Sequence, residues 1–205
     1  MTIQDPSGMQ PKIDSDCSSS IIGMVKQYCK IIRKPWPNGV RDKINDCIRK
    51  TAAKNGVSCN GPTPERVECM KNWCRNGALK CCGLSSTEKD ANCRNYCNDT
   101  RCGFTPGTYS CNPKYPVAPI IYLCTGIINF RDLGPCKNFN PHLPAEPGTF
   151  LHELGHACGI SHVDDSHKGQ RQCNNIFSCC MYEILVRGRN AANCTKNVPR
   201  DDWRY

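Results

Sequence analysis

Three of the chain's five histidines lie close together, in the stretch HELGHACGISH that ends at His162. His152 and His156 are four residues apart, so on a helix they project from the same face, one turn from each other. Two imidazoles with this spacing can bind one zinc ion. Glu153 follows the first histidine and can take a proton from a water beside the metal without being a ligand. The stretch therefore indicates hydrolytic zinc chemistry.

Gly159 separates this helix from the third histidine. A helix that stops abruptly commonly ends at a residue with positive φ, which glycine adopts most easily. The resulting turn would bring His162 back toward the metal as a third ligand. Three protein ligands leave one position for water, as in catalytic rather than structural zinc sites. The five specified positions of HExxHxxGxxH arise by chance in fewer than about one such chain in a thousand, whereas HExxH alone is only suggestive.

Other interpretations of the stretch are a surface helix with incidental histidines and a structural zinc site. The first leaves the coincidence of five positions unexplained. The second gives Glu153 no role and would normally recruit cysteine to close the site. An inactive relative of a zinc enzyme is a third interpretation, although no residue of the pattern is missing.

The segment resembles the zinc-binding consensus of the metzincin metalloendopeptidases. The resemblance implies zinc ligands at His152, His156 and His162. It also implies that Glu153 is the general base and acid of peptide hydrolysis. Metzincins place a methionine on a tight turn below the metal, and Met181, nineteen residues after the last histidine, matches that position. The alternative for this residue is an ordinary core methionine.

A second resemblance concerns the third ligand. The sequences PIIYLC at 119–124 and GTFLHE at 148–153 are similar to those of the deuterolysin-like aspzincins, which are secreted, disulfide-bonded zinc endopeptidases. Their third ligand is an aspartate, so Asp164 and Asp165 are the corresponding candidates. The GTxxDxxYG motif of that family is absent here, which favours His162. The expected reaction is the same with either ligand.

These residues predict a zinc-dependent endopeptidase that uses one catalytic Zn²⁺ and hydrolyses a protein or peptide substrate. The alternative is a cysteine-rich secreted binding module or toxin with a non-catalytic zinc site.

An extended substrate would pair with an exposed strand edge. The segment that we expect to form this edge, with an ordinary core strand as the equal alternative, consists of Ile120, Ile121, Tyr122 and Leu123.

The chain must also supply the elements that position this site. Helical spacing of apolar residues predicts helices from Ile21 to Ile32, from Val40 to near Asn55, from Pro64 to Asn76 and from Ser86 to about Tyr96. The composition changes after Cys102, where β-branched and aromatic residues favour a strand over 119–124. A loop and then the helix of the histidine stretch follow, with Thr149 as the expected N-cap.

The predicted fold class is therefore α+β and disulfide-rich. It has a largely helical N-terminal half, a small sheet, a zincin-type active-site helix and an irregular C-terminal subdomain. The predicted regions are a flexible segment over 1–16, a Cys-rich helical region over 17–102 and a catalytic region over 103–205. We expect cysteines to cross-link the last two regions into one unit.

Cysteine dominates the composition, with 19 in 205 residues. This density is typical of disulfide scaffolds in secreted proteins, so we expect an extracellular protein. The spacing of the cysteines does not determine which of them pair in disulfides. An odd number leaves at least one thiol unpaired. Cys17 lies in the loose segment DSDCSSS. It is either a disulfide partner or a mobile thiol that occupies the open zinc position and keeps the enzyme inactive.

Charge and hydropathy exclude other classes of partner. The formal net charge is +9, but Lys and Arg are spread along the chain without a nucleic-acid motif, so no nucleic acid is expected. The longest apolar runs, such as Ala118 to Leu123, are too short to span a bilayer. We expect a monomer.

Overall fold

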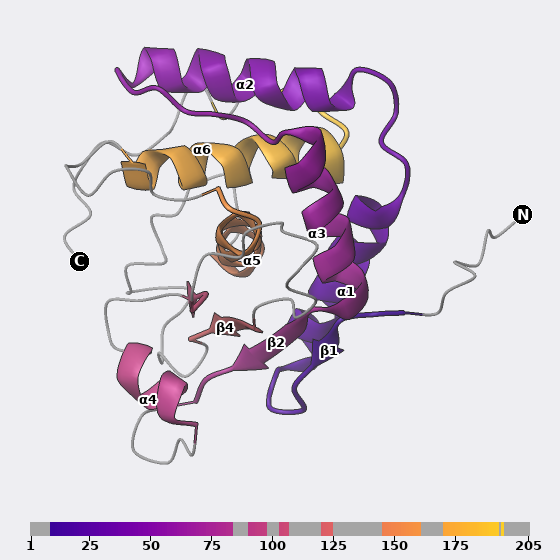
Figure 1. Ribbon diagram of the computed structural model, residues 1–205, viewed down its shortest axis with the longest axis vertical. Coiled ribbons are helices and arrows are strands. Elements are labelled where there is room, and N and C mark those ends of the chain that lie inside the picture. Colours follow the sequence, from indigo (N-terminus) through magenta and orange to yellow (C-terminus); the bar gives the residue numbers. More distant parts are fainter. Residues whose placement is uncertain are drawn as a thin grey trace, which may run out of the picture.

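The computed structural model describes residues 9–83, 90–97, 103–106, 120–124, 145–160, 170–192 and 194. These residues form a disulfide-rich α+β fold in which most of the long helices lie on one side of a small mixed sheet (Figure 1). The predicted fold class is therefore confirmed. Within the described residues, no helix is both long and apolar enough to cross a membrane.

Three long helices occupy the N-terminal half: α1 (Ser19–Arg33), α2 (Val40–Lys54) and α3 (Pro64–Asn76). The sequence explains where they begin. The side chain of Ser18 accepts a hydrogen bond from the third residue of α1, and Thr63 caps α3 in the same way. Gly39, with a φ of 78°, precedes α2. The first three predicted helices are confirmed to within two residues at each end.

The sheet has four strands in the order β1-β2-β4-β3: β1 (Lys12–Ile13), β2 (Ala78–Cys81), β4 (Ile120–Leu123) and β3 (Gly103–Phe104). The first three run parallel, and β3 pairs antiparallel with β4. Within the segment over 1–16, for which flexibility was predicted, residues 12–13 form β1 and pair with β2. A short helix, α4 (Ala91–Tyr96), begins after the N-cap Asp90.

The prediction that residues 120–123 form an exposed edge is wrong, because β4 is an inner strand with a partner on each side. The relative exposures of Ile121, Tyr122 and Leu123 are 0%, 2% and 0%. A continuous apolar run without polar alternation is what a strand covered on both faces requires. The described edge on this side of the sheet is the two-residue strand β3.

The central helix is α5 (Ala145–Ala157), seen nearly end-on in Figure 1 between α6 (Gln170–Met181) and the sheet. Phe150, Leu151 and Leu154 are fully buried on it. The predicted N-cap is wrong, because α5 begins before Thr149 and that residue lies buried inside the helix. Pro147 is the reason, since proline is tolerated in a first turn, where its missing N–H has no helical partner.

Two features of the C-terminal part were not predicted. Helix α6 has 12 residues, and the π-helix η2 (Tyr182–Val186) continues directly from it. The sequence carried a signal for α6, because Cys173, Ile176, Phe177 and Cys180 recur at helical spacing. This signal is visible only if cysteine is counted as an apolar residue.

Eight disulfides link cysteines within the described residues. They are Cys17–Cys81, Cys29–Cys74, Cys47–Cys180, Cys59–Cys173, Cys69–Cys158, Cys82–Cys93, Cys97–Cys124 and Cys179–Cys194. Four of them join the part of the chain before residue 103 to the part after it. Cys17 is 5% exposed and bonded to Cys81, so the first of the two alternatives, a disulfide partner, is confirmed, and the alternative of a mobile thiol is wrong.

Candidate metal centre

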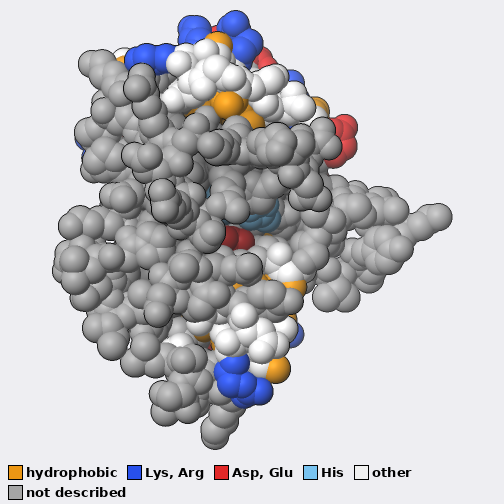
Figure 2. All heavy atoms as spheres, turned by 90° about the vertical axis from the view of Figure 1, so that its left-hand side faces the viewer, with side chains coloured by type: hydrophobic (Ala, Val, Ile, Leu, Met, Phe, Trp, Pro, Cys, Tyr) orange, Lys and Arg blue, Asp and Glu red, His pale blue; other side chains and the backbone are white. Residues whose placement is uncertain are grey.

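Helix α5 presents His152 and His156 together. Their Nε2 atoms lie 3.0 Å apart, and their rings meet edge to face with centroids 4.7 Å apart. With zinc–nitrogen bonds of about 2.0–2.1 Å, a tetrahedral site holds two nitrogens about 3.3–3.4 Å apart. The Nε2 atoms of the two rings therefore lie within hydrogen-bond distance of each other, at a spacing slightly shorter than that required by a single zinc ion. The histidine side chains are visible beside an acidic side chain in a recess of the face drawn in Figure 2.

Glu153 is buried next to this pair, with 5% of its surface exposed. Its Oε2 accepts a hydrogen bond from the Thr105 hydroxyl at 2.9 Å, and the same hydroxyl lies 3.3 Å from the Glu153 carbonyl oxygen. Thr105 follows β3 directly. The carboxylate is thus oriented by the sheet as well as by its own helix. Sequence reasoning missed Thr105, because 48 residues separate it from Glu153.

Gly103 allows β3 to approach α5 this closely. A Cβ atom at this position would lie 2.8 Å from Cγ2 of Thr149 and 3.1 Å from Cγ of Glu153. The first contact is shorter than real Cβ atoms show and the second is tight, so a side chain here would force Thr149, Glu153 or β3 to shift. The glycine therefore sets the distance between the hydroxyl of Thr105 and the carboxylate.

Helix α6 contacts both histidines through two asparagines that the sequence analysis did not identify. Oδ1 of Asn175 lies 3.0 Å from Nδ1 of His152. Nδ2 of Asn174 lies 2.9 Å from Nδ1 and 2.8 Å from Nε2 of His156. Asn174 is fully buried, and its Oδ1 has no hydrogen-bond partner among the described residues.

The end of α5 has the form of a Schellman motif. Gly159 has a φ of 75°, and its N–H donates to the carbonyl of His156 at 3.0 Å. The N–H of Ile160 donates to the carbonyl of Gly155 at 2.9 Å. This pair of bonds is the one that closes a helix on a left-handed residue. The chain therefore turns at Gly159, three residues after the second histidine and at the residue from which the sequence predicted a turn.

The third ligand stays a prediction. His162, favoured by the metzincin pattern, lies outside the described residues, and so do Asp164 and Asp165. The spacing of the first two histidines and the turn at Gly159 are compatible with either family resemblance.

Met181 is the last residue of α6, which runs on into η2. The tight turn expected at this methionine is therefore wrong, because the helical spacing of apolar residues continues through it. Its side chain is fully buried in the main core, as expected of a core methionine. A position below the metal stays a prediction.

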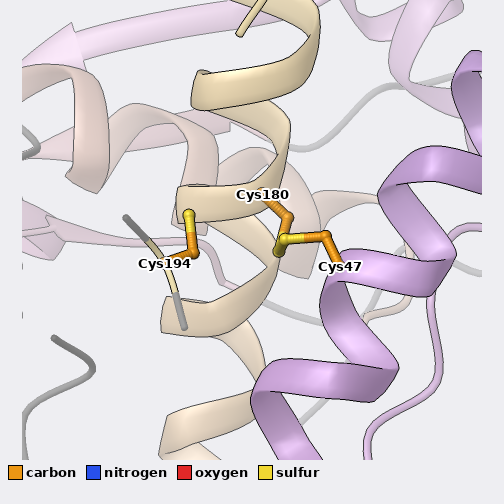
Figure 3. Close-up of side chains that lie close together, drawn as sticks. All are labelled: Cys47, Cys180 and Cys194. Carbon is orange, nitrogen blue, oxygen red and sulfur yellow. A yellow bond between two sulfur atoms is a disulfide. The ribbon is translucent and has the colours of Figure 1, made fainter. Parts of the chain in front are cut away.

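A group of three cysteines also has sulfur atoms within 4.8 Å of one another: Cys47, Cys180 and Cys194 (Figure 3). Cys47 is bonded to Cys180, and Cys194 is bonded to Cys179. Zinc binds cysteine as a thiolate, which a disulfide sulfur does not provide. We therefore interpret this group as a cross-link between α2 and the C-terminal helices.

Comparison of the chain with family models, curated proteins and solved structures found no match. The resemblance to the metzincins thus stays a prediction that rests on the residues of HExxHxxGxxH. The residues at its centre are described, and their geometry is the basis on which a function is proposed below.

Proposed function

We propose that the protein is a secreted zinc-dependent endopeptidase with its active site on α5. The observation that carries the proposal is the convergence of His152 and His156, whose Nε2 atoms lie 3.0 Å apart. The oriented carboxylate of Glu153 beside them supports a catalytic rather than a structural zinc site. Eight disulfides within the described residues are compatible with an oxidising, extracellular environment.

Each residue of the site would have a separate role in catalysis. His152 and His156 would hold the ion, and the motif assigns the third ligand to His162. Bound zinc supplies Lewis acidity, which polarises the scissile carbonyl and acidifies water. Glu153 accepts a proton from the attacking water and passes it to the departing amine. The hydrogen bond from Thr105 to Oε2 keeps the carboxylate in one orientation during both transfers.

The substrate would bind as an extended peptide beside β3. This strand ends the described sheet, and its first residue lies against Glu153. Main-chain pairing with a terminal strand binds a peptide with little dependence on its sequence. In this proposal β3 takes the role that the sequence analysis gave to residues 120–123.

Zinc content and proteolysis measured together test the proposal. The purified protein should hold one zinc per chain and cleave a reduced, alkylated protein substrate. A chelator should abolish cleavage, and added Zn²⁺ should restore it. His152→Ala and His156→Ala should each lose the metal and the activity, whereas His142→Ala, outside the motif, should keep both.

The outcomes separate the proposed enzyme from its alternative. Stoichiometric zinc that depends on both motif histidines, without cleavage of any unfolded substrate, would favour the non-catalytic binding module. A protein that binds no zinc would reject both. Cleavage that survives complete removal of the metal would reject the zinc mechanism alone.

A further inference from the structure

We infer that Asn175 of α6 is a positioning residue that holds His152 in the tautomer required for metal binding through Nε2. The inference rests on the proposed function, because it concerns the same histidine pair. Its starting point is the 3.0 Å contact between Oδ1 of Asn175 and Nδ1 of His152.

The chemistry of the two groups fixes the direction of this hydrogen bond. An amide oxygen only accepts, so Nδ1 of His152 must donate and therefore carries the hydrogen. A neutral imidazole carries one hydrogen, which leaves Nε2 of His152 with a lone pair. That atom is the one that lies 3.0 Å from Nε2 of His156. Asn175 thus selects the tautomer whose lone pair points into the candidate metal site.

Asn174 contacts the second histidine through its amide nitrogen. This nitrogen lies 2.9 Å from Nδ1 and 2.8 Å from Nε2 of His156. Because Nε2 of His152 keeps its lone pair, the 3.0 Å contact between the two Nε2 atoms requires Nε2 of His156 to carry the hydrogen, and Nδ1 of His156 then accepts from Nδ2 of Asn174. One asparagine therefore faces each histidine, and both belong to the same helix.

The packing of α6 makes it a rigid support for these contacts. A Cβ atom on Gly155 would lie 3.0 and 3.1 Å from two ring atoms of the buried Phe177, so α6 packs against the backbone of α5. Disulfides from Cys173 and Cys180 tie α6 to residues 59 and 47. An outer hydrogen-bond partner is most effective when its own position is fixed in this way.

The first test measures metal affinity by competition with a chromophoric chelator. Asn175→Ala should weaken zinc binding about 10- to 100-fold, the usual effect of removing an outer partner of a histidine ligand. Asn175→Asp should restore affinity to within a few-fold of the wild type, because a carboxylate oxygen accepts the same hydrogen bond. Asn72→Ala removes an exposed asparagine from α3 and should leave affinity unchanged.

The second test is independent of metal and of activity. Nitrogen-15 NMR of the metal-free wild-type protein should show Nδ1 of His152 protonated and Nε2 unprotonated. The opposite tautomer in the wild type would overturn the inference, as would unchanged zinc affinity in folded Asn175→Ala. If the wild type shows the expected tautomer but binds no zinc, the proposed function fails together with the role of Asn175 in metal binding, and only the tautomer of His152 stands.

Discussion

At the scale of single residues, the candidate site combines groups of two kinds. His152, Glu153 and His156 occupy neighbouring positions on α5, so helix geometry alone brings them together. Thr105 and Asn175 reach them from a strand end and from a second helix. The first kind could be predicted from spacing in the sequence. The second could not, because their proximity depends on how separate elements pack.

Thr105 provides a prediction at this scale. Thr105→Val keeps the shape of the side chain but removes the hydroxyl that donates to Oε2 of Glu153. Hydrogen bonds to charged groups contribute about 1.5–3 kcal/mol, so kcat/KM should fall roughly 10- to 100-fold. Zinc content should not change, because Thr105 contacts the carboxylate rather than the histidines.

Thr105→Ser, which retains the hydroxyl, is the control and should keep most of the activity. Steady-state cleavage of a fluorogenic peptide, together with metal analysis of each variant, makes the comparison. Full activity in Thr105→Val would mean that Glu153 needs no hydrogen bond from Thr105.

At the scale of elements, the separation between α5 and α6 decides whether the asparagines can reach the histidines. Gly155→Ala would place a methyl group 3.0 Å from the buried ring of Phe177. Overpacking of this kind costs about 1–3 kcal/mol, and it would move α6 away from α5. The variant should therefore show a lower free energy of unfolding and weaker zinc binding.

Gly23→Ala is the matched control, because it makes the same change within α1, where an added Cβ meets nothing within 4 Å. Replacing a mid-helix glycine by alanine should stabilise the protein by about 0.5–1 kcal/mol. Chemical denaturation should therefore show a lower free energy of unfolding for Gly155→Ala and a higher one for Gly23→Ala. If Gly155→Ala is as stable as the wild type, the close packing of α6 on α5 does not depend on a glycine at this position.

The helices could be predicted from their own residues more completely than the strands could. The periodicity of α1, α2 and α3 comes with caps that mark their ends, so local signals sufficed. The strand at 120–123 was recognisable from its apolar residues, but its place inside the sheet depends on β2 and β3. A strand's neighbours come from distant parts of the chain, so they cannot be read from the strand's own residues.

At the scale of the whole molecule, disulfides hold the helical first half against the site. Cys59–Cys173 spans 114 residues and ends next to Asn174. Cysteine content predicted such cross-links, but their pairing depends on the tertiary structure. The chain-entropy description of disulfides makes the stabilisation larger for a longer loop.

Removing this disulfide by the double substitution Cys59→Ser and Cys173→Ser leaves Cys47–Cys180 closed, which keeps residues 59 and 173 joined through about 19 residues (12 from 47 to 59 and 7 from 173 to 180). The free energy of unfolding should therefore fall by about 3 kcal/mol, less than an open loop of 114 residues would give. The matched double substitution Cys82→Ser and Cys93→Ser opens a separation of 11 residues, so its loss should also be about 3 kcal/mol. Guanidinium unfolding under non-reducing conditions compares them. A clearly larger loss for the first pair would contradict this account of the cross-linked loop.

The most direct measurement is cleavage of an unfolded protein by Glu153→Gln at the same zinc content as the wild type. Glutamine retains the length of the side chain and an oxygen that can accept from Thr105, but it cannot take up the proton of the attacking water. The variant should bind zinc as the wild type does and lose about 10²- to 10⁴-fold in kcat/KM. Wild-type cleavage by zinc-loaded Glu153→Gln would contradict the assignment of Glu153 as the base.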